Sequence, residues 1–203
     1  MRLFLLALLL FATPSLAQDG APAAPGYVTG NEASLQEQIS NAEDGDIGSQ
    51  YNLAMRYATG EGVPQDYALA LKWLEMAANR GDMDAQAAAG IMHQKGQGTN
   101  ADDHMAAHWY KRAALQGDRM SAFNLATLRA NGQGSFRDDK EAYYWVTVAS
   151  TMGEARVAAL QGVLQARMSA DDLREVEAKA AAFQPVRELD PQSNLLEQKR
   201  DGQ

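Results

Sequence analysis

Residues 60–81 read GEGVPQDYALALKWLEMAANRG, and the frame of this stretch returns twice at intervals of 36 residues. The frame has two glycines one residue apart, followed by Asp, Ala, Trp, Ala and Gly. Its copies are Gly60, Gly62, Asp66, Ala70, Trp73, Ala77 and Gly81; Gly96, Gly98, Asp102, Ala106, Trp109, Ala113 and Gly117; and Gly132, Gly134, Asp138, Ala142, Trp145, Ala149 and Gly153. No residue is inserted or deleted between copies. A fixed period of this length predicts stacked supersecondary units, a solenoid.

Each copy is expected to form a helix, a turn and a second helix, so the predicted fold class is all-α. In the first copy, Leu53 and Tyr57 share one face of a helix over residues 47–58. Ala70, Trp73 and Ala77, spaced three and four residues apart, share one face of the next helix. The tryptophans should fill the space between the two helices of a unit and stabilise the stack by burial. They are Trp73, Trp109 and Trp145.

The turn residues have predicted capping roles. A glycine that follows a helix adopts positive φ readily and closes the helix C-terminus. These glycines are Gly60, Gly96 and Gly132. An aspartate before an apolar-periodic run accepts the free backbone N–H groups at a helix N-terminus. These aspartates are Asp66, Asp102 and Asp138.

The repeated frame resembles the Sel1-like repeat family, which is related to the tetratricopeptide repeat. Copy one carries the family pattern as Ser49, Leu53, Ala54, Tyr57, Gly60, Gly62, Val63, Asp66, Ala70, Trp73, Ala77, Ala78 and Gly81. Copies two and three depart at the tyrosine (His93, Arg129) and at the valine (Thr99, Ser135). The resemblance implies a short right-handed α-solenoid of antiparallel helix pairs. It also implies an interaction scaffold, and exported bacterial members take part in envelope signalling, polysaccharide secretion or host contact.

The ends of the array differ from its interior because both lack the tryptophan. Glu37 stands at the equivalent position of a degenerate half-repeat, as suits a terminal unit with one face in water. The predicted boundaries are an N-terminal capping half-repeat at 32–45, repeats at 46–81, 82–117 and 118–153, a C-terminal capping helix pair at 154–183, and a disordered tail at 184–203.

The N-terminus resembles a secretory signal peptide over residues 1–17. Arg2 precedes ten apolar residues and a small-residue end, with cleavage expected after Ala17. A membrane anchor is the alternative, but a spanning helix needs about 20 apolar residues. Residues 18–31 contain Ala, Gly and two prolines and are predicted to form a flexible linker. The mature chain is therefore expected in the bacterial periplasm or outside the cell, without membrane insertion after cleavage.

Charge and composition exclude several classes of partner. The 203-residue chain has a formal net charge of −8. An acidic chain is poorly suited to bind nucleic acid or anionic lipid, which both need Lys and Arg. Because cysteine is absent, disulfides, thiolate metal sites and a lipid-anchored lipoprotein are impossible.

Three patterns suggest chemistry, but each lacks a required part. Phosphate-binding glycine loops follow a strand, whereas these glycines follow helices. His104 and His108 have zinc-ligand spacing on one helix, with Asp102 or Asp103 as a third ligand, but the metalloprotease glutamate is missing. No Ser-His-Asp arrangement is legible. We therefore predict no enzyme activity, no cofactor and no metal. A metal-binding protein using these histidines remains an alternative.

A second alternative is a hydrolase directed at the cell wall or at β-lactams. Some cysteine-rich members of the family that the chain resembles are described as binding or hydrolysing β-lactams. This chain lacks their cysteines.

A protein or peptide is the predicted partner, bound on the concave surface that stacked helix pairs create. The predicted contact residues are Asn52, Arg56 and Asn124. Equivalent positions hold Ala88, Met92 and Leu128, so the surface would grade from polar to apolar and suit a peptide with one anionic group. The alternative is that these residues pack between repeats.

Overall fold

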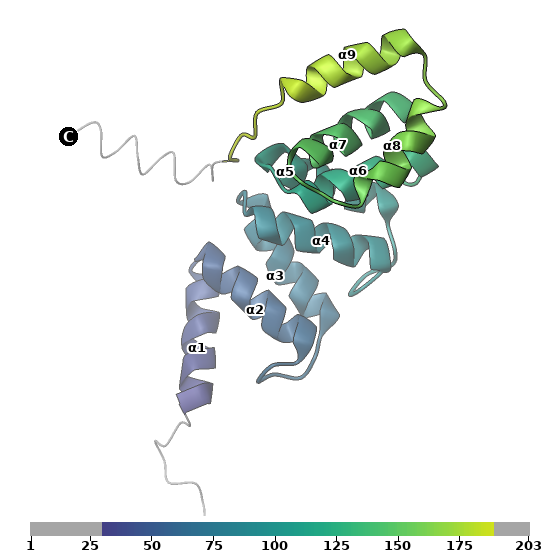
Figure 1. The fold of residues 1–203 in the computed structure, drawn as a ribbon. Coiled ribbons are helices and arrows are strands. Elements are labelled where there is room, and N and C mark those ends of the chain that lie inside the picture. The colour runs from purple at the N-terminus through teal and green to yellow at the C-terminus, as the bar shows by residue number, and fades with distance from the viewer. Residues whose placement is uncertain (1–29, 189–203) are drawn as a thin grey trace, which may run out of the picture.

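The computed structural model describes residues 30–188, which form nine helices without a strand in that range (Figure 1). The helices are α1 (Gly30–Glu43), α2 (Ile47–Thr59), α3 (Tyr67–Asn79), α4 (Met83–Lys95), α5 (Asp103–Gln116), α6 (Arg119–Asn131), α7 (Asp139–Thr151), α8 (Val157–Gln165) and α9 (Ala170–Ala181). Each helix packs on the next along the chain as far as α8, and both α8 and α9 pack on α7. This arrangement confirms the predicted all-α solenoid. None of the described helices has the length and apolarity to cross a membrane.

Two aspartates cap each repeat, one more than the sequence analysis assigns. Asp66, Asp102 and Asp138 are the N-caps of α3, α5 and α7, where their carboxylates accept backbone N–H groups. A second series caps the first helix of each pair, with N–H to carboxylate distances of 2.7–2.8 Å. Its members are Asp46, Asp82 and Asp118. Together these caps fix where all six repeat helices begin.

The two glycines of each turn have different structural roles. The first ends the helix as a left-handed C-cap, with φ of 80° at Gly60, 67° at Gly96 and 70° at Gly132. The second also has positive φ, and at Gly98 and Gly134 it lies against the beginning of the second helix of the preceding repeat, whereas Gly62 lies against the Arg56 guanidinium of its own repeat. A Cβ atom on Gly98 would overlap the carbonyl oxygen of Tyr67 and lie 2.5 Å from its carbonyl carbon. The turn is therefore a contact between repeats.

The tryptophans are buried unequally. Trp109 and Trp145 are 3% exposed, but Trp73 is only partly buried. Trp109 belongs to the apolar cluster that repeat one forms with α4. Repeat one itself is preceded by the single helix α1, so less apolar surface is available to cover Trp73. The Trp73 ring packs against the same cluster, but it fills the core less completely than the sequence predicts.

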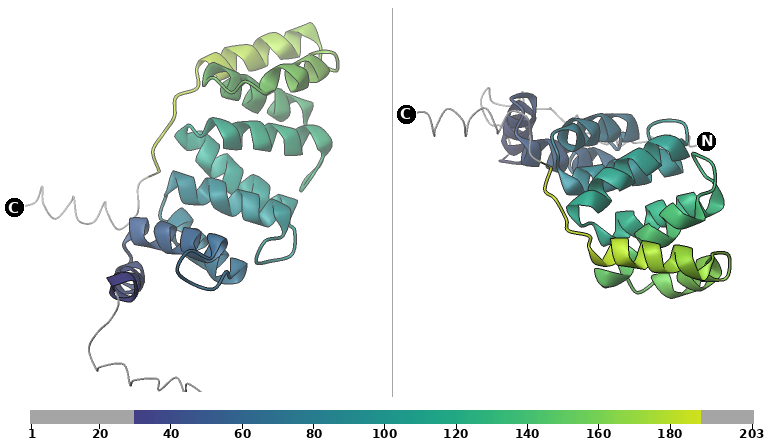
Figure 2. Two further views of the ribbon diagram at one scale, coloured as in Figure 1. Left: turned by 60° about the horizontal axis from the view of Figure 1, so that its bottom comes forward. Right: turned by 90° about the horizontal axis from the view of Figure 1, so that it is seen from above.

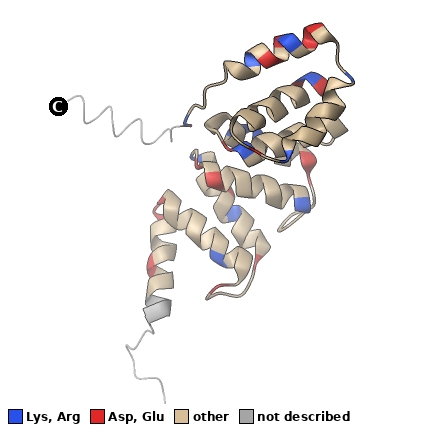
Figure 3. Ribbon diagram, in the orientation of Figure 1, with Lys and Arg blue, Asp and Glu red and all other residues tan. Residues whose placement is uncertain are grey.

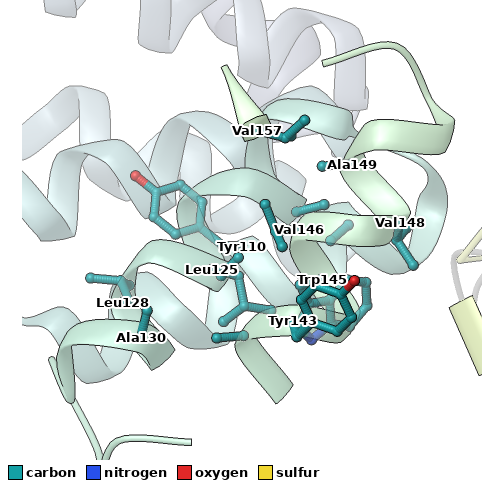
Figure 4. Packing of buried hydrophobic residues seen from close by; sticks show 14 of the residues in the cluster. Tyr110, Leu125, Leu128, Ala130, Tyr143, Trp145, Val146, Val148, Ala149 and Val157 are labelled. Atoms are coloured by element: carbon teal, nitrogen blue, oxygen red, sulfur yellow. The ribbon is translucent and has the colours of Figure 1, made fainter. Parts of the chain in front are cut away.

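The larger apolar cluster lies in repeats two and three and their C-terminal cap (Figure 4). Tyr110 and Tyr143 are its largest fully buried side chains. Burial raises the pKa of Tyr110 to about 12, and its hydroxyl donates to Gln94 Oε1 at 2.8 Å. A phenol that is buried with a hydrogen-bond partner stabilises the cluster in its neutral form.

The C-terminal cap is joined to repeat three by polar and aromatic contacts. The Tyr143 hydroxyl donates to Glu177 Oε1 of α9 at 2.7 Å and accepts from Gln165 Nε2 of α8 at 2.9 Å. Phe183, just after α9, packs edge-on against Trp145, with ring centroids 6.1 Å apart. Charges of both signs occur along α9 (Figure 3), and Asp172 pairs with Lys140 of α7 at 2.5 Å.

Side-chain amides and a guanidinium join successive units at one edge of the stack. Gln86 Nε2 donates to the Ala78 carbonyl at 3.0 Å. Gln116 Nε2 donates to the Gly81 carbonyl at 3.0 Å, and the Arg80 guanidinium donates in the same way to the Gly45 carbonyl one repeat earlier. These bonds satisfy carbonyls where second helices end, so this edge is polar and ordered.

The chain termini differ in part from the predicted boundaries. The predicted signal peptide at 1–17 lies outside the described residues, as does most of the linker. Helix α1 begins at Gly30, within the predicted linker at 18–31. At the other end, residues 184–188 belong to the predicted disordered tail, but they run in extended form beside the stack (Figure 2). Contacts with α4 and α5, described below, hold them there; residues 189–203 lie outside the described part.

Candidate functional site

The predicted contact residues of repeat one line an open pocket between α1 and α2. Its cavity volume is about 410 Å³, and it is lined by Ser34, Gln38, Asn52, Met55, Arg56, Thr59 and Glu61. Asn52 is exposed, and Arg56 is half-buried. The Arg56 guanidinium donates to Gln38 Oε1 at 3.1 Å and to the Glu61 carbonyl at 3.2 Å. The Asn52 amide therefore faces solvent beside a cation that the protein already orients.

The structure does not bring Asn124 to this pocket. Asn124 is half-buried on α6, in repeat three, whereas Asn52 and Arg56 lie in repeat one. Met92 and Leu128 are 5% and 0% exposed and belong to the two apolar clusters. The expected surface that grades from polar to apolar is therefore wrong, because its apolar members pack between helices.

His104 and His108 lie on α5 beside a smaller pocket of about 190 Å³. Its lining is His104, Ala107, His108, Lys111, Arg129, Gly134 and Ser135. Burial is the largest cause of a lowered pKa at His108, followed by the charges of Arg112 and His104. Cationic neighbours disfavour a metal cation between these histidines. Within residues 30–188, no group of three His, Cys, Asp or Glu side chains is placed to hold a metal.

The same pocket is also a poor anion site. Glu141 lies 2.6 Å from Arg129 and 3.5 Å from Lys111, so one carboxylate already neutralises part of the positive charge. The pocket therefore offers neither a ligand set for a metal nor an unopposed cation for a phosphate or carboxylate.

A third site, which we call the edge site, consists of Gln86, Arg112, Leu115 and Gln116 with Gly81 and Gly117. It lies where α5 ends and α4 begins, and residues 184–188 run along it (Figure 2). The Val186 N–H donates to the Leu115 carbonyl at 3.0 Å. The Glu188 N–H donates to Gln116 Oε1 at 2.9 Å. These two bonds hold the backbone of an extended segment.

The Glu188 carboxylate is the most strongly bound group of that segment. Arg112 donates to its Oε1 from Nη2 at 2.9 Å and from Nε at 3.2 Å. Gln86 Nε2 donates to its Oε2 at 2.6 Å. A guanidinium that presents two N–H groups to one carboxylate gives strong and directional recognition. The edge site is therefore built around a carboxylate.

Two glycines leave room for the segment. A Cβ atom on Gly81 would lie 2.5 Å from the Glu188 carbonyl oxygen, and one on Gly117 would lie 3.2 Å from Pro185. Both residues have positive φ, of 93° and 106°. They occupy the same position in successive repeats, so the segment lies across two repeats at equivalent points.

The edge site was not among the predicted contact surfaces, although the sequence contains one signal for it. Arg112 and Gln116 are four residues apart on one helix, where the equivalents in repeat three are Val148 and Met152. Gln86 has Ala122 as its equivalent in repeat three, although repeat one has Gln50 at this position and Arg80 at that of Gln116. The arginine at position 112, whose equivalents are Met76 and Val148, therefore distinguishes repeat two and indicates a local binding site.

Comparison with known families explains the repeat. The family model described as the Sel1 repeat matches residues 47–82, 84–118 and 119–154. The matches cover more than half of the chain and coincide with the helix pairs α2–α3, α4–α5 and α6–α7. The chain belongs to the Sel1 repeat family. Sel1 repeat proteins generally act in protein–protein interactions.

Solved structures with the same fold come from bacteria. A Sel1 repeat protein from Oxalobacter formigenes is 33% identical, with a TM-score of 0.57, over 64% of this Sel1 repeat chain and 98% of that protein. A protective antigen of uropathogenic Escherichia coli with an SLR fold is 26% identical, with a TM-score of 0.64. That match covers 87% of this chain but only 38% of the antigen. The comparison with curated proteins gave no match.

Proposed function

We propose that this Sel1 repeat protein is an exported, periplasmic scaffold, without enzyme activity, that binds a protein or peptide partner in envelope signalling, secretion or host contact. The observation that carries the proposal is the extended segment 184–188, which the stack holds through backbone and carboxylate contacts. A fold that recognises one extended polypeptide in this way has the groups needed to recognise another.

Two surfaces are candidates for the contact with the partner. The pocket between α1 and α2 is open and presents Asn52 and Arg56. The edge site is occupied by the segment of the same chain. Both surfaces are mostly polar, which is typical of interfaces that form and dissociate. Export is supported by the signal-peptide pattern at 1–17 and is consistent with the bacterial antigen among the structural relatives.

Site-specific photo-crosslinking in the native bacterium tests the scaffold function. A photoreactive amino acid at Met55, beside the open pocket, or at Leu115, in the edge site, should give a discrete adduct with a partner protein. The same group at Arg174, which is 71% exposed on α9, is the matched control and should give none.

The intact mass of the exported protein tests the predicted cleavage after Ala17. It should correspond to a chain that starts at Gln18.

Two outcomes would contradict the proposal. The first is the absence of adducts at both Met55 and Leu115 in cells that make the protein at its native level. The second is turnover of a cell-wall substrate by the purified protein, since a hydrolase needs no stable protein partner.

A further inference from the structure

The edge site has the groups of a binding site for an extended peptide. Resting on the scaffold function above, we propose that it is the receptor for an extended segment of a partner protein that carries one carboxylate, and that residues 184–188 occupy it as an intramolecular competitor. The partner segment is expected to carry a carboxylate three residues after a proline or a small apolar residue, as Glu188 follows Pro185. Its backbone would make the two bonds that Val186 and Glu188 now make.

The receptor groups are oriented by contacts that do not involve the segment. Gln86 is fully buried, and its amide also donates to the Ala78 carbonyl and accepts from Gln116 Nε2 at 2.9 Å. The Arg112 guanidinium lies 4.9 Å from the centroid of the Trp109 ring, in a cation–π contact. The donors would therefore keep their positions after the segment leaves. Such a preorganised site binds a new carboxylate with little ordering entropy.

The segment, by contrast, is held by few groups. The Val186 side chain is 69% exposed, and residues 184–187 are all exposed. The Glu188 side chain is 40% exposed, compared with 19% for Arg112. A strap that serves the fold would bury apolar side chains, since burial of apolar area is the main source of stability. This segment buries little of it, so a competing peptide can displace it without disrupting the core.

The path of the segment defines the length of the recognised stretch. Pro185 lies at Gly117 and Glu188 at Gly81, so four residues extend from one repeat to the one before it. At the next equivalent glycine, Gly45, the space is filled by the Arg80 guanidinium. The site therefore binds a short segment in one direction. The segment runs from repeat two toward repeat one, and its carboxylate is at its C-terminal end.

Binding of a labelled hexapeptide to the full chain tests the proposal. The probe is FQPVRE, the sequence of residues 183–188, with both ends blocked and a fluorescent label, and binding is followed by fluorescence polarisation. A tethered segment competes at an effective concentration of about 1 mM. With a peptide dissociation constant of about 100 µM, the wild-type site would be about 90% occupied by its own segment.

Two variants open the site without changing its receptor groups. Glu188→Gln removes the competing carboxylate, and Val186→Pro removes the N–H that bonds to Leu115. Each should bind the probe about tenfold more tightly than the wild-type chain does. Adding Arg112→Gln to either variant should abolish this gain. Adding Lys111→Gln, which removes a neighbouring positive charge on the same helix, should preserve it. Circular dichroism checks that each variant is folded.

Three results would overturn the inference. One is that the probe binds neither opened variant, which would make residues 184–188 a structural strap. Another is that a probe with Gln in place of Glu binds as tightly as FQPVRE, since the site would then not recognise the carboxylate. The last is a concentration-dependent dimer of an opened variant in sedimentation, which would make a second copy the occupant. Partner adducts at Met55 would remain in all three cases, so the scaffold function is tested separately.

Discussion

Replacing Gly98 by alanine should lower the free energy of unfolding by about 2–5 kcal/mol. Gly98 has φ of 79°, a conformation that an L side chain adopts at an energetic cost. Its Cβ atom would also overlap the Tyr67 carbonyl oxygen and lie 2.9 Å from the Ala68 nitrogen. Because these are backbone atoms at the beginning of α3, neither can rotate away. The turn would have to separate from repeat one. Urea denaturation followed by circular dichroism measures the change.

Gly153→Ala is the matched control for this substitution. Gly153 also has positive φ, of 83°, but a Cβ atom there would have no neighbour within 4 Å. The Gly153→Ala substitution should therefore lower the free energy of unfolding only through the cost of positive φ, by about 1–2 kcal/mol. Equal losses at the two positions would contradict the conclusion that the second glycine of the turn is a contact between repeats.

Replacing Trp109 by alanine should lower the free energy of unfolding by about 3–5 kcal/mol. The ring is 3% exposed and joins repeat one to α4 in one apolar cluster. In a solenoid each repeat contacts only its neighbours, so loss of a central contact weakens the coupling between the two sides of the array. The midpoint of urea denaturation should fall, and the transition should become broader as the array loses cooperativity.

Trp73→Ala is the comparison for this prediction. The Trp73 ring is only partly buried, so its removal should cost less than removal of the Trp109 ring. If Trp73→Ala destabilised the chain as much as Trp109→Ala, the unequal burial of the three tryptophans in the structure would be wrong.

The fold was predictable because its signal is repeated. Three copies in one register identify the same glycine turn, aspartate cap and tryptophan, and the structure places each of them at the expected point of a helix pair. The second series of caps, at Asp46, Asp82 and Asp118, also recurs every 36 residues. It could have been found by the same comparison of copies.

The surface was less predictable than the fold. Whether a residue such as Met92 or Leu128 faces a groove or the neighbouring repeat depends on how successive helix pairs are rotated. Periodicity within one helix does not contain that rotation. The same limit explains Trp73, whose exposure is determined by how little of the stack precedes it.

The edge site was only partly within reach of pattern analysis, for a different reason. Its contacts join residues 76 positions apart for Arg112 and 102 apart for Gln86, and its ligand belongs to a polar, proline-containing stretch. Pro185 disfavours helix at Gln184 and keeps the chain extended there. Such composition is typical of a loose tail, and only the arrangement of three polar side chains on the stack shows where the segment binds.

Amide hydrogen exchange at Val186 and Glu188 in the full chain tests the central claim most directly, namely that the stack binds an extended segment through its backbone and one carboxylate. If the segment is bound about 90% of the time, its amides can exchange only during the remaining tenth. Exchange in the wild-type chain should therefore be about tenfold slower than in the Arg112→Gln variant. The Lys111→Gln variant should keep the protection. Equal and fast exchange at both amides in the wild-type chain and in Arg112→Gln would contradict the account.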